Sequence, residues 1–217
     1  MNGSLLFAEG GHFAAVIKVA DDVHTLILVG ASTGGPKALT ELFAHLPCFP
    51  GVACCVVQHM PAGFTYNLAK RLNDLSAWRV AEGVDGGVIE AGGAYVAPGG
   101  CQMRIEESGA ALRMSVQREV SGHLHQPSVD VLFASAVALS DKVRLFGVIL
   151  TGMGRDGAVG LKAIRERGGF TVAEGPETAT IYGMPRAAWE SGAAAVRLPL
   201  HEIPACLIEQ VHFANGR

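Results

Sequence analysis

The sequence lacks any run of about 18 consecutive apolar residues, the length that a helix needs to cross a bilayer. It also lacks clusters of Lys and Arg, since 17 basic residues stand against 20 acidic ones and the net charge is −3. These absences argue against a membrane-spanning protein and against nucleic acid as a main partner. Charged residues make up only 17% and apolar residues 49% of the 217 residues, which argues against disorder and favours a globular domain with its own core.

Cysteine pairs with metal-binding spacing are also absent. The five cysteines include no C-x-x-C pair, and Cys54-Cys55 lie inside an apolar run typical of a buried strand. This usage argues against a cysteine zinc site and indicates a reducing compartment. The first 22 residues carry no basic start and are interrupted by Glu9, Gly10 and Gly11, so they are not expected to act as a signal peptide. We therefore expect a cytoplasmic protein.

Short apolar runs alternate with helical patterns along most of the chain. The expected strands are 25–29, 51–57, 94–97, 144–150 and 170–173, a hairpin is expected over 101–120, and the expected helices are 36–45, 64–72, 129–139, 158–167, 185–190 and 203–213. Alternation of this kind predicts a doubly wound three-layer α/β/α sandwich with a mainly parallel sheet and an antiparallel hairpin at one edge. Residues 1–24 are expected to form an N-terminal arm, and residues 25–217 the single domain.

A glycine-rich turn follows the first predicted strand directly. Residues 30–35, GASTGG, fit G-x-S-x-G between a strand and a helix, the setting in which a sharp turn raises a nucleophilic serine above the sheet. Backbone N–H groups at the start of the next helix can face a developing oxyanion. The motif alone fits equally a glycine-rich turn that holds a phosphate. Ser32 is therefore a candidate nucleophile that needs further support.

That support comes from His59 and Asp156. His59 follows the second predicted strand, and Asp156 lies in the loop after the strand at 144–150. Because the carboxyl ends of parallel strands meet at one edge of a sheet, the three side chains can come together. A neutral imidazole can take the serine proton, and a carboxylate on its other nitrogen fixes the tautomer. The chain order is Ser32, His59, Asp156, whereas α/β-hydrolases have the order serine, acid, histidine.

Six blocks of sequence, in order, are similar to one known family. They are GASTGGPKAL, VVQHMPAGFT, YVAPGG, HQPSVDVLF, LTGMGRDGAVGL and YGMPRAA. Together they resemble the catalytic domain of CheB, the chemotaxis protein-glutamate methylesterase, over about residues 25–200. The resemblance implies that Ser32 is the nucleophile, His59 the base and Asp156 the acid. It also implies a doubly wound α/β/α sandwich with an added antiparallel hairpin, in agreement with the pattern above.

The activity implied by the resemblance is hydrolysis of glutamate γ-methyl esters on the cytoplasmic helices of chemoreceptors, with release of methanol. Deamidation of receptor glutamines through the same acyl-enzyme is implied as well. The partner implied is the methylated cytoplasmic domain of a chemoreceptor, without nucleic acid and without membrane insertion. No cofactor and no metal are expected.

The sequence departs from the familiar family pattern in two places. Family members commonly carry an N-terminal receiver domain, but only about 24 residues precede the first predicted strand, too few for a domain. The chain is expected to be either a stand-alone esterase or a fragment, and a separate response regulator is a candidate partner. Second, Cys101-Gln102 stand where relatives commonly have histidine or another polar residue, which is expected to alter the wall of the cleft.

Other polar residues near these motifs are assigned smaller roles. The backbone N–H groups of Thr33 and Met153 are candidate oxyanion donors, and His125 is expected to line the cleft. His123 and His125 have a spacing that can bind metal on a strand, but no cysteine or carboxylate cluster accompanies them. Asp156 could also cap the helix that begins near Gly157.

Three alternative functions stay open at this point. A Rossmann-like nucleotide binder would want G-x-G-x-x-G and an acid at the end of the second strand, whereas Ser32 and Gln58-His59 stand at those positions. A catalytically silent receptor-binding module would not need serine, histidine and aspartate all at strand ends. A different esterase or lipase for small substrates would favour a deep apolar pocket over an open cleft.

Overall fold

The computed structural model describes residues 23–119 and 124–214, so the arm predicted for residues 1–24 lies almost wholly outside the described residues. The elements in chain order are β1 (Thr25–Ala31), α1 (Gly35–His45), β2 (Val52–Gln58), α2 (Phe64–Leu75), β3 (Arg79–Glu82), β4 (Gly93–Val96), β5 (Gln102–Ser108), β6 (Ala111–Gln117), α3 (Val129–Val137), β7 (Arg144–Ile149), α4 (Ala158–Glu166), β8 (Phe170–Glu174), α5 (Met184–Glu190), β9 (Val196–Leu198), a short 3-10 turn (Leu200–Glu202) and α6 (Ile203–Ala214).

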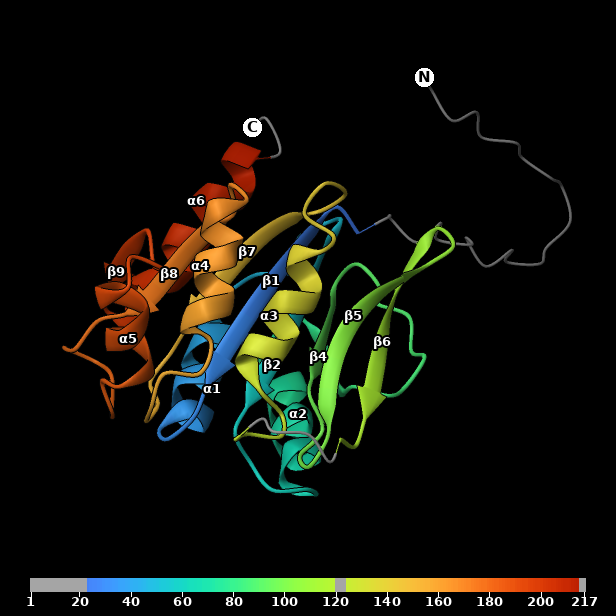
Figure 1. Ribbon diagram of the computed structural model, residues 1–217, viewed down its shortest axis with the longest axis horizontal. Helices are drawn as coiled ribbons and strands as arrows, with labels where there is room; N and C mark the ends of the chain where they lie inside the picture. The colour runs from blue at the N-terminus through green and yellow to red at the C-terminus, as the bar shows by residue number, and fades with distance from the viewer. Residues whose placement is uncertain (1–22, 120–123, 215–217) are drawn as a thin grey trace, which may run out of the picture.

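A parallel main sheet forms the middle layer of the molecule (Figure 1). Within the described residues it contains seven strands in the order β3-β4-β2-β1-β7-β8-β9, and every neighbouring pair is parallel. The chain builds from β1 toward β2 on one side and later returns to place β7 on the other side. The strand order therefore reverses at β1, and the loops beyond the carboxyl ends of β1, β2 and β7 meet there. Such a reversal is where ligands bind in open α/β sheets.

Helices cover both faces of the sheet, which explains the wholly apolar strands. In β1, Ile27 and Val29 pack into a core with α1, α2 and α6, whereas Leu26 and Leu28 pack into a second core with α3, α4 and α5. All four side chains are completely buried. Burial on both faces removes the polar alternation of a surface strand. The predicted three-layer α/β/α sandwich is confirmed.

The predicted hairpin is present, but it does not extend the main sheet. Strands β5 and β6 pair only with each other among the named strands, and Figure 1 shows them beside α3 and apart from the main sheet. Met103, Ile105 and Met114 turn inward to the core that α3 also covers. The hairpin thus packs in the same layer as α3, on one face of the main sheet. Strands β3 and β9 form the edges of the main sheet. The sequence pattern did not indicate these two short edge strands.

The strand register places the ends of three strands at one level. Ala31 of β1 lies opposite Gln58 of β2, and Gly30 of β1 lies opposite Ile149 of β7. Neighbouring strands are about 4.8 Å apart. The residues that follow these strands therefore leave the sheet side by side, at its lower edge in Figure 1.

Candidate active site

Ser32 is the first residue after β1 and lies at the start of a tight turn into α1. Its N–H donates to the carbonyl of Thr151 at 3.0 Å, and its carbonyl accepts from the N–H of Gly35 at 2.8 Å and from Nε2 of Gln58 at 2.9 Å. Gly34 has a φ of 85°, a left-handed conformation that glycine adopts without strain. The turn therefore ties all the polar backbone of Ser32 to the protein and leaves its half-buried side chain toward the strand-end loops.

His59 follows β2 directly and forms a close pair with Asp156. Its Nε2 lies 2.8 Å from Oδ2 of Asp156, and the two side chains are only 9% and 10% exposed. The other ring nitrogen, Nδ1, is buried and has no hydrogen-bond partner among the described residues. An imidazole held by a carboxylate through one nitrogen has the other nitrogen free to accept a proton. His59 therefore has the arrangement of a general base, with Nδ1 as the available nitrogen.

Asp156 lies in the loop between β7 and α4 and binds the N-terminus of α3. Its Oδ2 accepts the N–H of Val129 at 2.8 Å, and its Oδ1 accepts the N–H of Asp130 at 3.1 Å and the hydroxyl of Ser128 at 2.9 Å. Burial acts to raise the pKa of Asp156, but the hydrogen bonds from His59, Val129 and Asp130 outweigh it and hold the pKa well below its usual range. The carboxylate is therefore charged when it faces His59.

Asp156 caps a different helix from the one considered in the sequence analysis, since it binds the N-terminus of α3 and not that of α4. Helix α4 has Gly157 as its N-cap, which has no side chain, and the carboxylate that binds its first turn is that of Asp130 and not that of Asp156. The helix that Asp156 binds is α3, whose N-terminal N–H groups and partial positive charge favour a carboxylate. Ser128 is the N-cap of α3, as the sequence predicts, and also contacts Asp156.

Asp130 places a second carboxylate beside Asp156. Oδ1 of Asp130 accepts the N–H of Gly160 at 2.7 Å, which joins α3 to α4. Burial raises the pKa of Asp130, and the charge of Asp156 adds to that shift while the Gly160 N–H opposes it. The neighbouring carboxylate therefore resists ionisation more than Asp156 does, which is expected where two acids share one site.

His125 lies against the face of His59. The two ring centroids are 4.1 Å apart and the ring planes differ by 16°, so the rings are stacked. Burial lowers the pKa of His125, the neighbouring His59 lowers it further, and Asp156 acts in the opposite direction. The structure places His125 beside the candidate base, and its role in lining the cleft stays a prediction. His123, its partner in the H-x-H spacing, lies outside the described residues.

The two candidate oxyanion donors lie on two loops that meet at Ser32. In the residues that the structure describes, the N–H groups of Thr33 and Met153 donate to no protein acceptor. Gly152 lies so close to Ser32 that a Cβ on Gly152 would stand 2.7 Å from the Cβ of Ser32. Only glycine permits this approach, and it places the loop with Met153 beside the candidate nucleophile.

The hydroxyl of Ser32 and the ring of His59 lie on neighbouring strand ends without a hydrogen bond between them in the described structure. Such bonds are often absent before a substrate binds. The structure thus brings His59, Asp156 and His125 into contact, and it places Ser32, Thr33 and Met153 on the adjoining loops. Arg155, in the same loop as Asp156, is exposed.

The supporting roles of two buried glutamines were not predicted from the sequence. Gln102, expected to alter the cleft wall, is completely buried and joins two backbone groups instead. Its Nε2 donates to the carbonyl of His125 at 2.8 Å, and its Oε1 accepts the N–H of Ser128 at 2.8 Å. Gln58 similarly links the carbonyls of Ser32 and His59. The sequence held one indication of this role, because Gln58 is the polar residue that ends the otherwise apolar strand β2.

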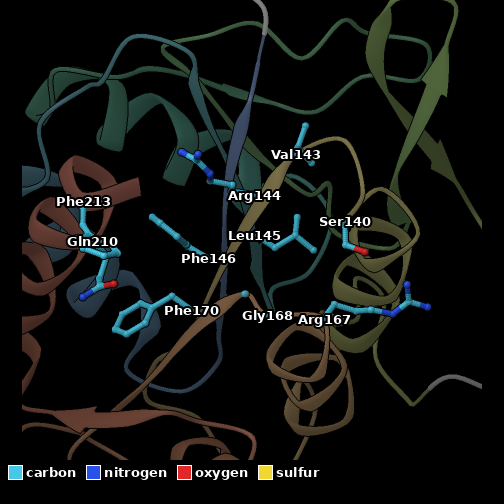
Figure 2. A pocket seen from close by; sticks show the side chains of 11 residues that line it. Ser140, Val143, Arg144, Leu145, Phe146, Arg167, Gly168, Phe170, Gln210 and Phe213 are labelled. Carbon is cyan, nitrogen blue, oxygen red and sulfur yellow. The ribbon is translucent and has the colours of Figure 1, made fainter. Parts of the chain in front are cut away.

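Another cavity lies at the opposite end of the main sheet. It has a volume of about 570 Å³ and is lined by Arg144, Phe170 and Phe213, among others. Figure 2 shows Phe170 and Phe213 on one side of β7 and Arg167 on the other. Since Arg144 begins β7 and Asp156 follows its far end, this cavity is separate from the candidate active site. No helix within residues 23–119 and 124–214 is long and apolar enough to cross a membrane.

Residues 27–207 match the family model described as CheB methylesterase. A protein from Pseudomonas aeruginosa named protein-glutamate methylesterase/protein-glutamine glutaminase 2 is 47% identical over 188 residues, which cover 85% of this chain and 52% of the relative. A relative from Geobacillus kaustophilus with the same type of name is 43% identical over 187 residues, which cover 86% of this chain and 53% of the relative.

A solved structure confirms the fold. The catalytic domain of the Thermotoga maritima CheB methylesterase superimposes with a TM-score of 0.81 at 36% identity, covering 86% of this chain and 98% of that domain. The chain spans about half the length of the curated relatives it matches. Sequence, fold and strand-end geometry agree, and the chain belongs to the CheB methylesterase family.

Proposed function

We propose that this protein hydrolyses glutamate γ-methyl esters on the cytoplasmic helices of chemoreceptors, with Ser32 as nucleophile, His59 as general base and Asp156 as the orienting acid. The observation that supports this most strongly is the pair formed by His59 and Asp156, 2.8 Å apart and nearly buried, at the strand end next to Ser32. In serine hydrolases, an imidazole held in this way transfers a proton to and from the nucleophile.

The first half of the reaction transfers the acyl group to Ser32. Nδ1 of His59 takes the hydroxyl proton as the serine oxygen forms a bond to the ester carbonyl carbon. The negative charge that develops on the carbonyl oxygen is stabilised by the N–H groups of Thr33 and Met153, which are free to donate. The bond to the methoxy group then breaks, and His59 returns the proton so that methanol leaves.

The second half regenerates the enzyme. Water gives a proton to Nδ1 of His59 as its oxygen bonds to the acyl-enzyme carbonyl carbon. The bond to the Ser32 oxygen then breaks and His59 returns the proton to that oxygen, so Ser32 is restored and the glutamic acid product loses its proton to solvent. Asp156 stays charged throughout and stabilises the imidazolium. A glutamine side chain can follow the same route with ammonia as the leaving group, so deamidation is a second reaction of the same site.

Exposed apolar side chains next to the site residues support a protein substrate. Met153 is 74% exposed and Leu124, next to His125, is 91% exposed, while Phe64 at the start of α2 is 58% exposed. Exposed apolar groups that gather near a site mark contact with another protein more often than with a small polar metabolite. The methylated cytoplasmic region of a chemoreceptor fits this requirement and would place the protein in the cytoplasm.

The alternatives are less well supported. A nucleotide-binding module would have an acid at the end of β2, whereas Gln58-His59 stand there and His59 contacts Asp156. A catalytically silent receptor-binding module would have no requirement for a buried imidazole with one open nitrogen. The similarity to named methylesterases also favours catalysis.

The test is release of methanol from methylated chemoreceptor membranes. The protein should release methanol in proportion to its concentration, and Ser32→Ala should fall to the background rate while keeping the far-ultraviolet circular dichroism spectrum. Thr33→Ala, which leaves the backbone N–H in place, is the matched control and should retain most of the activity. Methanol release that is equal for the parent protein and Ser32→Ala would disprove the proposed mechanism.

A further inference from the structure

A buried glutamate, Glu174, is connected to the candidate nucleophile through Thr151. Glu174 is the last residue of β8 and is completely buried. Its Oε2 accepts the N–H of Thr151 at 2.7 Å, whereas its Oε1 has no hydrogen-bond partner in the described part of the chain. The side chain of Thr178 also interacts with this carboxylate, yet a completely buried carboxylate with one oxygen unpartnered still costs free energy. The contacts of its partner, Thr151, indicate which residues this hydrogen bond helps to position.

Thr151 connects three separate segments at the site. Its carbonyl accepts the N–H of Ser32 at 3.0 Å, and its hydroxyl donates to the carbonyl of Thr33 at 2.9 Å. The same hydroxyl accepts the N–H of Ile181 at 2.9 Å. Thr151 itself is only 1% exposed. A shift of Thr151 would therefore move Ser32 and Thr33 together.

The loop that carries Met153 depends on the same residue. Gly152 follows Thr151, and its N–H donates to the carbonyl of Ile181 at 3.0 Å. The carbonyl of Gly152 accepts N–H groups from Gly183 and Met184. Thr151 and Gly152 thus form a seam with residues 181–184, and Met153 is the next residue along. The positions of the candidate nucleophile and of both candidate oxyanion donors meet at Thr151.

Space is available for this seam to move. Thr151 lines a cavity of about 280 Å³ together with Gly34, Lys37, Glu174 and Thr178, among others. Because Thr151 borders this cavity, side-chain packing does not enclose it on every side, and packing alone does not hold it against Ser32. Besides its hydrogen bonds to Ser32, Thr33 and Ile181, the bond from the Thr151 N–H to Glu174 ties Thr151 to the end of β8.

We infer that Glu174 is a positioning residue, whose carboxylate holds Thr151 so that Ser32, Thr33 and Met153 keep the geometry needed for attack and oxyanion binding. This inference rests on the proposed function. Catalytic groups must be held within about 0.5 Å of their productive positions, and a misplacement of about 1 Å can cost about 100-fold in rate. Glu174 touches no substrate in this account and acts only through Thr151.

Two substitutions separate positioning from charge and from stability. Glu174→Ala removes the acceptor and enlarges the cavity, so kcat should fall about 10- to 100-fold while KM stays within about 2-fold. Glu174→Gln keeps an oxygen that can accept the Thr151 N–H, so it should retain activity within about 3-fold of the parent. Rescue by glutamine shows that the hydrogen bond is needed and the charge is not.

A control on the same strand accounts for lost stability. Thr171 in β8 is also completely buried, and its hydroxyl donates to the carbonyl of Ala193 at 2.8 Å and accepts the N–H of Ala195 at 2.9 Å. Neither of these hydrogen bonds involves Thr151. Thr171→Val should lower the melting temperature as Glu174→Ala does, yet leave kcat within about 2-fold of the parent value when assayed well below that temperature.

The experiment measures the rate at which a fluorophosphonate labels Ser32, together with methyl ester hydrolysis. Labelling needs a positioned Ser32 and no receptor, since the serine oxygen bonds to phosphorus as fluoride leaves. Slow labelling of Glu174→Ala, with normal labelling of Glu174→Gln and Thr171→Val, is the expected result. Equal labelling of Glu174→Ala and the parent would overturn the role of Glu174. Normal labelling without ester hydrolysis would instead count against the proposed function.

Discussion

The imidazole of His59 is stacked on that of His125, with the ring centroids 4.1 Å apart and the planes within 16° of parallel. Asp156 holds His59 at one ring nitrogen, but a single hydrogen bond permits rotation about its axis. The stacked ring limits that rotation. Asp156 and His125 together therefore fix both the direction and the plane of the candidate base.

Replacing His125 tests whether the stack orients the base. His125→Ala removes the flat surface, and turnover should fall about 2- to 10-fold, the equivalent of the energy of one aromatic stack. His125→Phe keeps a flat ring and should lose less activity than alanine. His45→Ala, at an exposed position of α1, is the control. Equal losses for alanine and phenylalanine at position 125 would show that stacking does not orient His59.

Replacing Asp156 should lower both activity and stability. Asp156→Asn is expected to reduce kcat by about 10⁴-fold, since an asparagine in this position favours the wrong imidazole tautomer. Asparagine also has one acceptor oxygen where Asp156 uses two to bind Ser128, Val129 and Asp130. The free energy of unfolding at pH 7 should therefore fall by about 1–3 kcal/mol, measured by urea titration. A variant as stable as the parent would mean that these bonds do not support α3.

The pH dependence of stability follows from the pKa of Asp156. That pKa is lower in the folded protein than its usual value of about 3.9. A carboxyl group of this kind contributes stability above its unfolded pKa, and the contribution is lost as the pH falls through the folded pKa. Below about pH 4 the parent protein should therefore lose more stability than Asp156→Asn.

Urea titrations at pH 5, 4 and 3 measure this difference. Asp74→Asn, at an exposed position of α2, is the matched control and should follow the parent protein at every pH. If the stability of Asp156→Asn changes with pH as that of the parent protein does, the charged carboxylate does not stabilise the folded state.

Gln102 should support the segment that carries His125. Gln102→Leu removes both hydrogen bonds and leaves the His125 carbonyl and the Ser128 N–H without partners, so stability should fall by about 2–4 kcal/mol. Turnover should fall as well, because His125 loses its anchor. Gln117→Leu, on the exposed partner position of β6, should leave both stability and turnover nearly unchanged. The urea midpoint and kcat of the two variants provide the comparison.

The main layers of the fold could be predicted from the sequence because burial on both faces leaves a clear pattern. Strands β1, β2 and β7 are apolar at nearly every position. The strand β3 is four residues long with Arg79 and Glu82 exposed or half-buried, and β9 has three residues, so neither has such a run. The strand order and the separate hairpin depend on contacts between distant residues, which periodicity does not encode.

The candidate site could be predicted in its residue types and only partly in its connections. Strand-end loops and the family resemblance identified Ser32, His59 and Asp156 as a set. The contacts of Asp156 with α3 join residues that are 26–28 positions apart, and no local pattern indicates them. Glu174 left a weak signal, since it is an acid at the end of the apolar strand β8.

Ser32, His59 and Asp156 are proposed to act as one unit, and the most direct test is whether the losses of activity caused by their substitutions add. Residues that act together are strongly non-additive, because removing one disables the others. Ser32→Ala and the double variant Ser32→Ala/His59→Ala should therefore release methanol from methylated receptor membranes at the same residual rate. A double variant slower than Ser32→Ala by the full factor that His59→Ala costs alone would show that the two residues work independently, and would contradict the account.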